Sequence, residues 1–199
     1  MALRLCLVAY WMGLAVWLSG LVTAAISASM VFGRLPDMSL SLRRFQAYPV
    51  EEHGTIAAGL VMSDVFFAVD VVQFIAIPVV VVTLVLQLAV FGVPARRPAN
   101  VVRAACLLLA AALFAWYALL LAPTLNSELR LFWQAAEVAD FDAALRHREI
   151  FRAGHTTARH ILEVNLMLVL VSLAASAMAL GPAPGPRRKL DPPLLAADP

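Results

Sequence analysis

Four long apolar stretches, separated by shorter polar segments, dominate the pattern of hydrophobic positions along the chain. They cover about residues 5–32, 55–92, 101–122 and 155–180. A helix needs about 20 mostly apolar residues to cross a bilayer, and each stretch is long enough for one crossing. The pattern therefore predicts an all-α integral membrane protein. We expect a four-helix transmembrane bundle that forms a single domain over residues 1–180.

The first two stretches each allow a second interpretation. The first is longer than the apolar region of a cleaved signal peptide, which has about 7–15 residues, so a membrane helix is favoured. If the second were one helix of 38 residues, it would be about 57 Å long, against a hydrocarbon core of about 30 Å. Either this helix begins outside the lipid and enters near Asp70, or it is tilted and kinked at Pro78. We favour the first alternative, with some kink.

The segment between the third and fourth stretches is mixed in charge. Its apolar side chains recur near helical spacing, at Leu125, Leu129, Phe132 and Trp133 among others. This spacing predicts an amphipathic helix at the membrane surface. After residue 181 the chain has six prolines in eighteen residues, which predicts a flexible tail over residues 181–199.

The composition agrees with a membrane protein and excludes other classes. Hydrophobic residues make up 62% of the chain and charged residues 14%, whereas soluble domains are about 45–50% apolar and about 25% charged. The net charge is only +2, and no basic run alternates with aromatic residues, so nucleic acid is not an expected partner. The expected partner is the lipid bilayer. Cys6 and Cys106 are too few for a disulfide framework.

The basic residues bear on location and orientation. Of the fifteen, only Lys189 is a lysine, and together with abundant alanine and leucine this is typical of GC-rich bacterial genomes. We therefore predict a bacterial inner membrane protein. Four spans place both termini on one side. Lysines and arginines number seven on that side and eight on the other. The compact clusters in residues 95–103 and 186–189 favour the cytoplasm for the termini.

Ionisable and polar side chains within or beside the apolar stretches are the candidate functional residues. One series, which leads into the fourth stretch, advances by steps of three or four residues, so it lies on one helix face: Arg148, Arg152, His155, Arg159 and Glu163. Charged side chains in a span usually face the bundle interior or a water path. We therefore predict a polar site between helices two and four, formed by His53, Asp64, Asp70, His155, Arg159, His160, Glu163 and Asn165. The alternative is structural: these residues lie at the headgroup level or neutralise one another across helices.

The chemistry of such a site is not that of an enzyme. The chain has no Walker loop, no G-x-G-x-x-G and no G-x-S-x-G motif. His160 and Glu163 resemble half of a helical metal site, but the first and third stretches offer no carboxylate or histidine to complete it. A non-covalent haem held by two of His53, His155 and His160 is geometrically possible. We expect no enzymatic activity and no cofactor, and keep a haem or metal redox protein as an alternative.

Several short motifs occur in an order that is similar to a known family. "VWLSGLV" is followed by "RLP" and "AYP"; His53 stands four residues after Pro49, and Phe151 four before His155. This pattern resembles the small four-helix integral membrane family of transmembrane protein 205 and its bacterial relatives, a domain of unknown function, over about residues 16–170. The resemblance implies the fold and carries no settled catalytic activity. Only Pro49, His53, Phe151 and His155 match residue by residue.

Two functions follow as expectations. The first is a non-enzymatic membrane protein whose polar inter-helix site helps to move or tolerate a small solute. The second is an accessory or structural subunit of a larger membrane complex. The expected protein partners are either the chains of such a complex or a second copy of this chain in a homo-oligomer. The mixed-charge segment motivates the second function, and so does a small-residue face in the first helix, formed by Gly20, Ala24 and Ala28.

Overall fold

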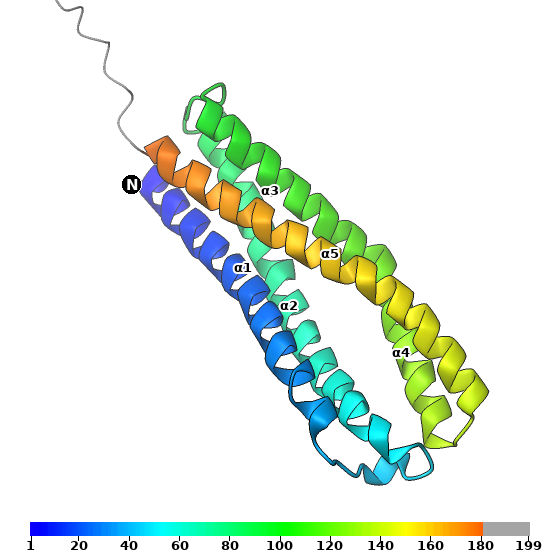
Figure 1. Cartoon of the computed structure of the whole chain (residues 1–199). Coiled ribbons are helices and arrows are strands. Elements are labelled where there is room, and N and C mark those ends of the chain that lie inside the picture. The colour runs from blue at the N-terminus through cyan, green and yellow to red at the C-terminus, as the bar shows by residue number, and fades with distance from the viewer. Residues whose placement is uncertain (181–199) are drawn as a thin grey trace, which may run out of the picture.

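The computed structural model describes residues 1–180, which fold into an elongated bundle of helices (Figure 1). The predicted tail, 181–199, lies outside the described residues. The long helices are α1 (Ala2–Phe32), α2 (His53–Ala89), α3 (Pro98–Trp116), α4 (Ala122–Glu137) and α5 (Phe141–Leu180). Short 3-10 turns, η1 (Leu35–Asp37), η2 (Arg43–Phe45) and η3 (Val50–Glu52), lie between α1 and α2.

The predicted fold class is confirmed. Four continuous helical segments are long and apolar enough to cross a membrane: Ala2–Asp37, Val50–Ala89, Pro98–Glu137 and Phe141–Ala179. Within residues 1–180 every regular element is helical. The architecture is therefore that of a multi-pass membrane protein with four apolar helices.

The helices associate as two antiparallel pairs, α1 with α2 and the α3–α4 segment with α5 (Figure 1). In the first pair the backbones come close at Gly13. A Cβ there would lie 2.9 Å from Val80 Cγ2, which is closer than carbon atoms normally approach. Small residues allow this kind of contact between membrane helices, where close packing replaces the hydrophobic effect as the main attraction.

Polar and aromatic side chains join the two pairs at the end of the bundle that holds the N-terminus. Tyr10 of α1 and Ser176 of α5 share a hydrogen bond of 2.7 Å between their hydroxyl oxygens. Arg103 of α3 is only 3% exposed; its Nη2 donates to Gln87 Oε1 of α2 over 3.1 Å. The Arg103 guanidinium also lies 5.5 Å from the centre of the Tyr10 ring. These contacts link all four segments at this end.

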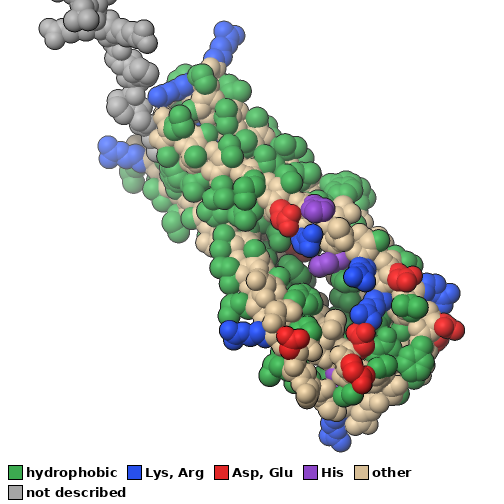
Figure 2. Space-filling view, viewed as in Figure 1, with side chains coloured by type: hydrophobic (Ala, Val, Ile, Leu, Met, Phe, Trp, Pro, Cys, Tyr) green, Lys and Arg blue, Asp and Glu red, His purple; other side chains and the backbone are tan. Residues whose placement is uncertain are grey.

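The bundle is longer than a bilayer is thick. Pro98–Glu137 has 40 residues, which corresponds to about 60 Å of helix against a hydrocarbon core of about 30 Å. Figure 2 shows where the excess lies. Hydrophobic side chains cover the half with the N-terminus, and charged side chains gather on the other half. We infer that the charged half extends out of the lipid.

A π turn joins α3 to α4 just before Pro123. The turn, η4, covers Tyr117–Leu121, and the Ala122 N–H donates to the carbonyl oxygen of Tyr117, five residues earlier. Pro123 has no N–H and its ring would clash with the carbonyl four residues before it, at Leu119. The wider turn accommodates the proline without ending the helix. The amphipathic segment therefore begins as a continuation of α3 and packs along α5.

The last helix begins earlier than its apolar pattern suggests. A tight turn with Ala139 at φ 57° precedes α5, and Asp140 Oδ1 accepts a hydrogen bond of 3.1 Å from the Ala143 N–H. This side chain caps the first turn of the helix. The polar residues 141–154 thus belong to the same helix as the apolar stretch that follows.

Candidate functional site

A cavity of about 400 Å³ lies between the two helix pairs. Every long helix contributes to its wall, and most of the lining side chains are apolar or aromatic. A second cavity of about 330 Å³ shares three lining residues with the first: Phe32, Phe151 and His155. Together the two spaces run along the charged half of the bundle and into the apolar half. We call the cavity of about 400 Å³ the inner cavity and the cavity of about 330 Å³ the outer cavity.

Two polar contacts lie in the wall of the inner cavity. The Tyr117 hydroxyl, at the start of the π turn, donates to Asp70 Oδ2 of α2 over 3.3 Å. Trp17 Nε1 of α1 donates to Gln73 Oε1 over 3.1 Å. Asp70 and Gln73 are three residues apart on α2, so both side chains lie on the face that lines the cavity.

Asn165 of α5 contributes an amide with one unused acceptor. Its Nδ2 donates to the Ala110 carbonyl of α3 over 3.2 Å, which fixes the orientation of the amide. The side chain is only 2% exposed, and its Oδ1 has no partner among residues 1–180. A buried acceptor without a donor costs about 1–3 kcal/mol. Asn165 lines the inner cavity, and a hydrogen-bond donor that reached its Oδ1 would remove that cost.

His155 stands where the two cavities meet. Its ring stacks on Phe151, with ring centres 5.3 Å apart and an interplanar angle of 23°. Both residues are half-buried. The four-residue spacing on α5 brings the two rings together on the face that lines both cavities.

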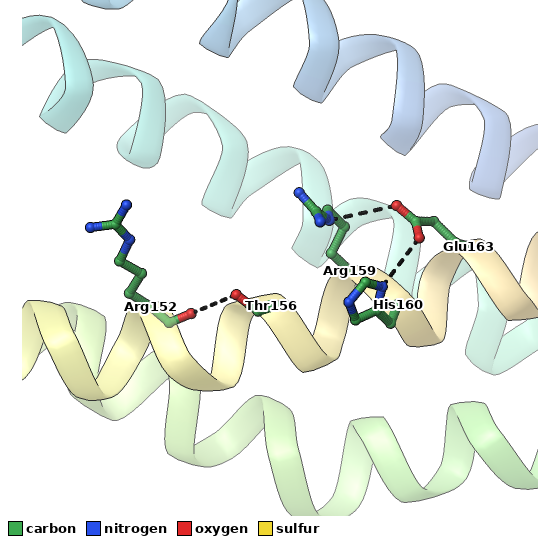
Figure 3. A network of polar contacts seen from close by, with 5 residues as sticks. All are labelled: Arg152, Thr156, Arg159, His160 and Glu163. Carbon is green, nitrogen blue, oxygen red and sulfur yellow. Dashed lines mark hydrogen bonds and ion pairs between the residues drawn. The ribbon is translucent and has the colours of Figure 1, made fainter.

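Three exposed side chains of α5, Arg159, His160 and Glu163, form a network of polar contacts (Figure 3). Glu163 is bonded to Arg159 at 3.5 Å and to His160 at 3.3 Å. Arg159 lines the inner cavity, but 62% of its side chain is exposed. His160 and Glu163 line neither cavity. Glu163 is thus paired with two residues of its own helix.

The outer cavity is more polar. Arg148 Nη1 donates to Glu52 Oε1 over 2.9 Å and ties α5 to the turn before α2. The Arg152 guanidinium has no partner among residues 1–180; only its backbone carbonyl is engaged, by Thr156. Trp133 of α4 also lines the outer cavity. Its Nε1 is buried and has no acceptor among residues 1–180.

His53 belongs to neither cavity. It is 2% exposed, and its ring fixes the loop before α2. Nδ1 accepts from the Leu42 N–H over 2.9 Å, while Nε2 donates to the carbonyls of Phe45 and Tyr48 at 2.8 and 3.2 Å. Both ring nitrogens are thus engaged, which leaves none to bind haem. All the hydrogen bonds of this ring are to the backbone of the loop before α2.

The structure brings together part of the predicted set. Asp70, His155, Arg159 and Asn165 line the inner cavity. Asp64 is exposed on α2 and lines neither cavity. Within residues 1–180 no ion pair joins α2 to α5. No group of three or more His, Cys, Asp or Glu side chains in that range is arranged to hold a metal ion.

Sequence reasoning missed Tyr117 and the aromatic lining. Tyr117 lies near the end of an apolar stretch, six residues before Pro123. A tyrosine so close to a proline inside a span is the signal that would have pointed to it. Phe32, Phe66 and Phe114 carry no such signal, because a phenylalanine in a membrane helix normally contacts lipid or the core.

Comparison with known proteins adds no relative. No protein-family profile, no curated protein and no solved structure matches the chain.

Proposed function

We propose that this chain is a non-enzymatic, multi-pass membrane protein that binds a small amphipathic solute between its two helix pairs, in the service of transport or tolerance. One observation carries the proposal. The inner cavity of about 400 Å³ is lined by Asn165, whose buried Oδ1 has no donor among residues 1–180. Ligand sites are typically concave and mostly apolar, with a few fixed polar groups.

The position of the inner cavity in the bundle supports the entry of a solute from the aqueous phase. Its lining extends from Arg159 and His155 in the charged half to Gln73 and Asn165, which lie in apolar stretches. A solute would thus pass from the charged half into the depth of the membrane without crossing lipid. At the other end the contact of Arg103 with Gln87, 3.1 Å long, holds the helix pairs together.

Photolabelling tests this proposal. The probe is a benzyl alcohol that carries a trifluoromethyldiazirine, added to the protein in nanodiscs of zwitterionic lipid and mapped by peptide mass spectrometry. We expect saturable labelling of cavity residues such as Phe66, Phe151 and Leu162. Ile75 and Val82, exposed on α2, serve as lipid-facing controls and should be labelled in proportion to probe without saturation. Labelling of the lipid-facing residues alone would refute the proposal.

The resemblance to the transmembrane protein 205 family is part of the proposal. It rests on Pro49, His53, Phe151 and His155. Two of these, Phe151 and His155, stack at the junction of the cavities. Pro49 immediately precedes η3, and His53 holds the loop in front of α2. Two of the matching residues thus lie at the loop before α2, and two lie at the junction of the two cavities.

We further propose a bacterial inner membrane with both termini in the cytoplasm. Arg4, Arg96, Arg97 and Arg103 belong to the end of the bundle that holds the N-terminus, and no Asp or Glu among residues 1–180 lies at that end. Unbalanced basic residues beside spans favour the cytoplasmic side. The outer cavity then opens away from the cytoplasm. A reporter enzyme that works only outside the cytoplasm should be inactive when fused after Pro199. An active fusion would show that the termini lie outside the cytoplasm and would contradict the proposed orientation.

A further inference from the structure

Two side chains of the inner cavity, Asp70 and Asn165, each carry an acceptor oxygen without a donor among residues 1–180. Asp70 is the one carboxylate among its described lining residues. Tyr117 engages Oδ2 of that carboxylate at 3.3 Å, and Oδ1 has no partner in residues 1–180. Asn165 Oδ1 is a second acceptor without a donor. A ligand that fits these atoms must donate hydrogen bonds, and a positive charge near Asp70 would be stabilised.

The cation that also lines this cavity does not cancel that charge. Arg159 lies near the charged half, with 62% of its side chain exposed, and it pairs with Glu163 at 3.5 Å. Water and this carboxylate therefore screen its charge. Asp70 has only the neutral Tyr117 beside it, so its charge stays uncompensated by protein.

Aromatic rings surround the same space. Phe32, Phe66, Phe114, Tyr117 and Phe151 all line the inner cavity. The rings of Phe114 and Tyr117 have centres 6.2 Å apart. The face of an aromatic ring attracts cations, and aromatic side chains recur in sites for ammonium groups. The rings also provide the apolar surface that an aromatic ligand needs.

From these observations we propose that the inner cavity selects small aromatic molecules that carry a protonated amine. The ammonium group binds Asp70, and the apolar body packs against the aromatic lining. This inference rests on the proposed function, because it names the class of solute for the same cavity.

Three fluorescent probes with one ring system test the inference: naphthylmethylammonium, naphthylmethanol and naphthoate. Binding is measured by fluorescence anisotropy with the full chain in zwitterionic nanodiscs, with empty nanodiscs as the blank. The wild type should bind the ammonium about tenfold more tightly than the alcohol, a difference of about 1.4 kcal/mol. The carboxylate should bind most weakly.

The variant Asp70→Asn keeps the shape of the side chain and an acceptor for Tyr117. It should remove the preference of the site for the ammonium over the alcohol. Asp64→Asn is the matched control, since Asp64 is an exposed carboxylate on the same helix; it should leave all three affinities unchanged. An equal affinity of the wild type for ammonium and alcohol, or no effect of Asp70→Asn, would overturn the inference and spare the proposed function. No binding of any probe would remove both.

Discussion

Gly54→Ala is expected to destabilise the protein by about 3 kcal/mol, because overpacking against backbone typically costs about 1–3 kcal/mol or more. A Cβ at Gly54 would collide with the carbonyl oxygen of Leu35 and lie 2.8 Å from Pro36 Cα. Both obstacles are backbone atoms of η1, which cannot rotate away as a side chain can. The α2 helix and η1 would have to separate. That movement would also loosen the loop that His53 holds.

The measurement is the thermal midpoint of the purified protein in one detergent, followed by size-exclusion chromatography. A loss of about 3 kcal/mol corresponds to a drop on the order of 10 °C for a chain of this size. Gly59→Ala is the matched control on the same helix, because a Cβ there meets only Trp133 Cζ2 at 3.9 Å. Alanine is a better helix former than glycine, so the control should be unchanged or slightly stabilised. Equal losses in the two variants would contradict the close packing of η1 on α2.

The apolar stretches were enough to predict the helices but not where they end. Gly154 precedes the apolar part of the fourth stretch and looks like a helix boundary. It lies instead inside α5, where a Cβ would come within 2.8 Å of Leu125 Cδ2 of α4. The glycine serves helix packing, which no local pattern reveals. The true start depends on Asp140, whose carboxylate caps the Ala143 N–H.

Pro123 also suggests a helix end that the structure does not have. A proline normally marks the end of a helix, and the sequence offers no sign that a π turn accommodates it. The π turn begins at Tyr117, and this residue donates to Asp70. The contact depends on how α2 and α3 are placed relative to each other. Helical spacing along one chain segment cannot supply that information.

Candidate site residues were predictable from the sequence where a polar side chain lies within an apolar stretch and on the helix face that turns toward the cavity. Asp70 and Asn165 are polar residues within apolar stretches, and both line the inner cavity. The i, i+4 spacing of Arg159 and Glu163 matches their ion pair. His53 was harder, since its partners Leu42, Phe45 and Tyr48 lie in an irregular loop without periodicity. Its burial follows from the path of that loop.

The second large effect expected is the loss of solute binding in Ala158→Phe. Ala158 is half-buried on α5 and lines the inner cavity. A phenyl group there would occupy the space between the helix pairs that the ring of a solute needs. Ala153→Phe is the matched control, because Ala153 is exposed on the same helix and lines neither cavity. Thermal midpoints of both variants verify that they fold.

The most direct test of the account is the binding of naphthylmethanol, a neutral probe, to the wild type and these two variants in zwitterionic nanodiscs. If the space between the helix pairs is the solute site, the wild type and Ala153→Phe bind saturably with one probe per chain. In that case Ala158→Phe shows only the signal of empty nanodiscs. Saturable binding to Ala158→Phe with the affinity of the wild type would contradict the account.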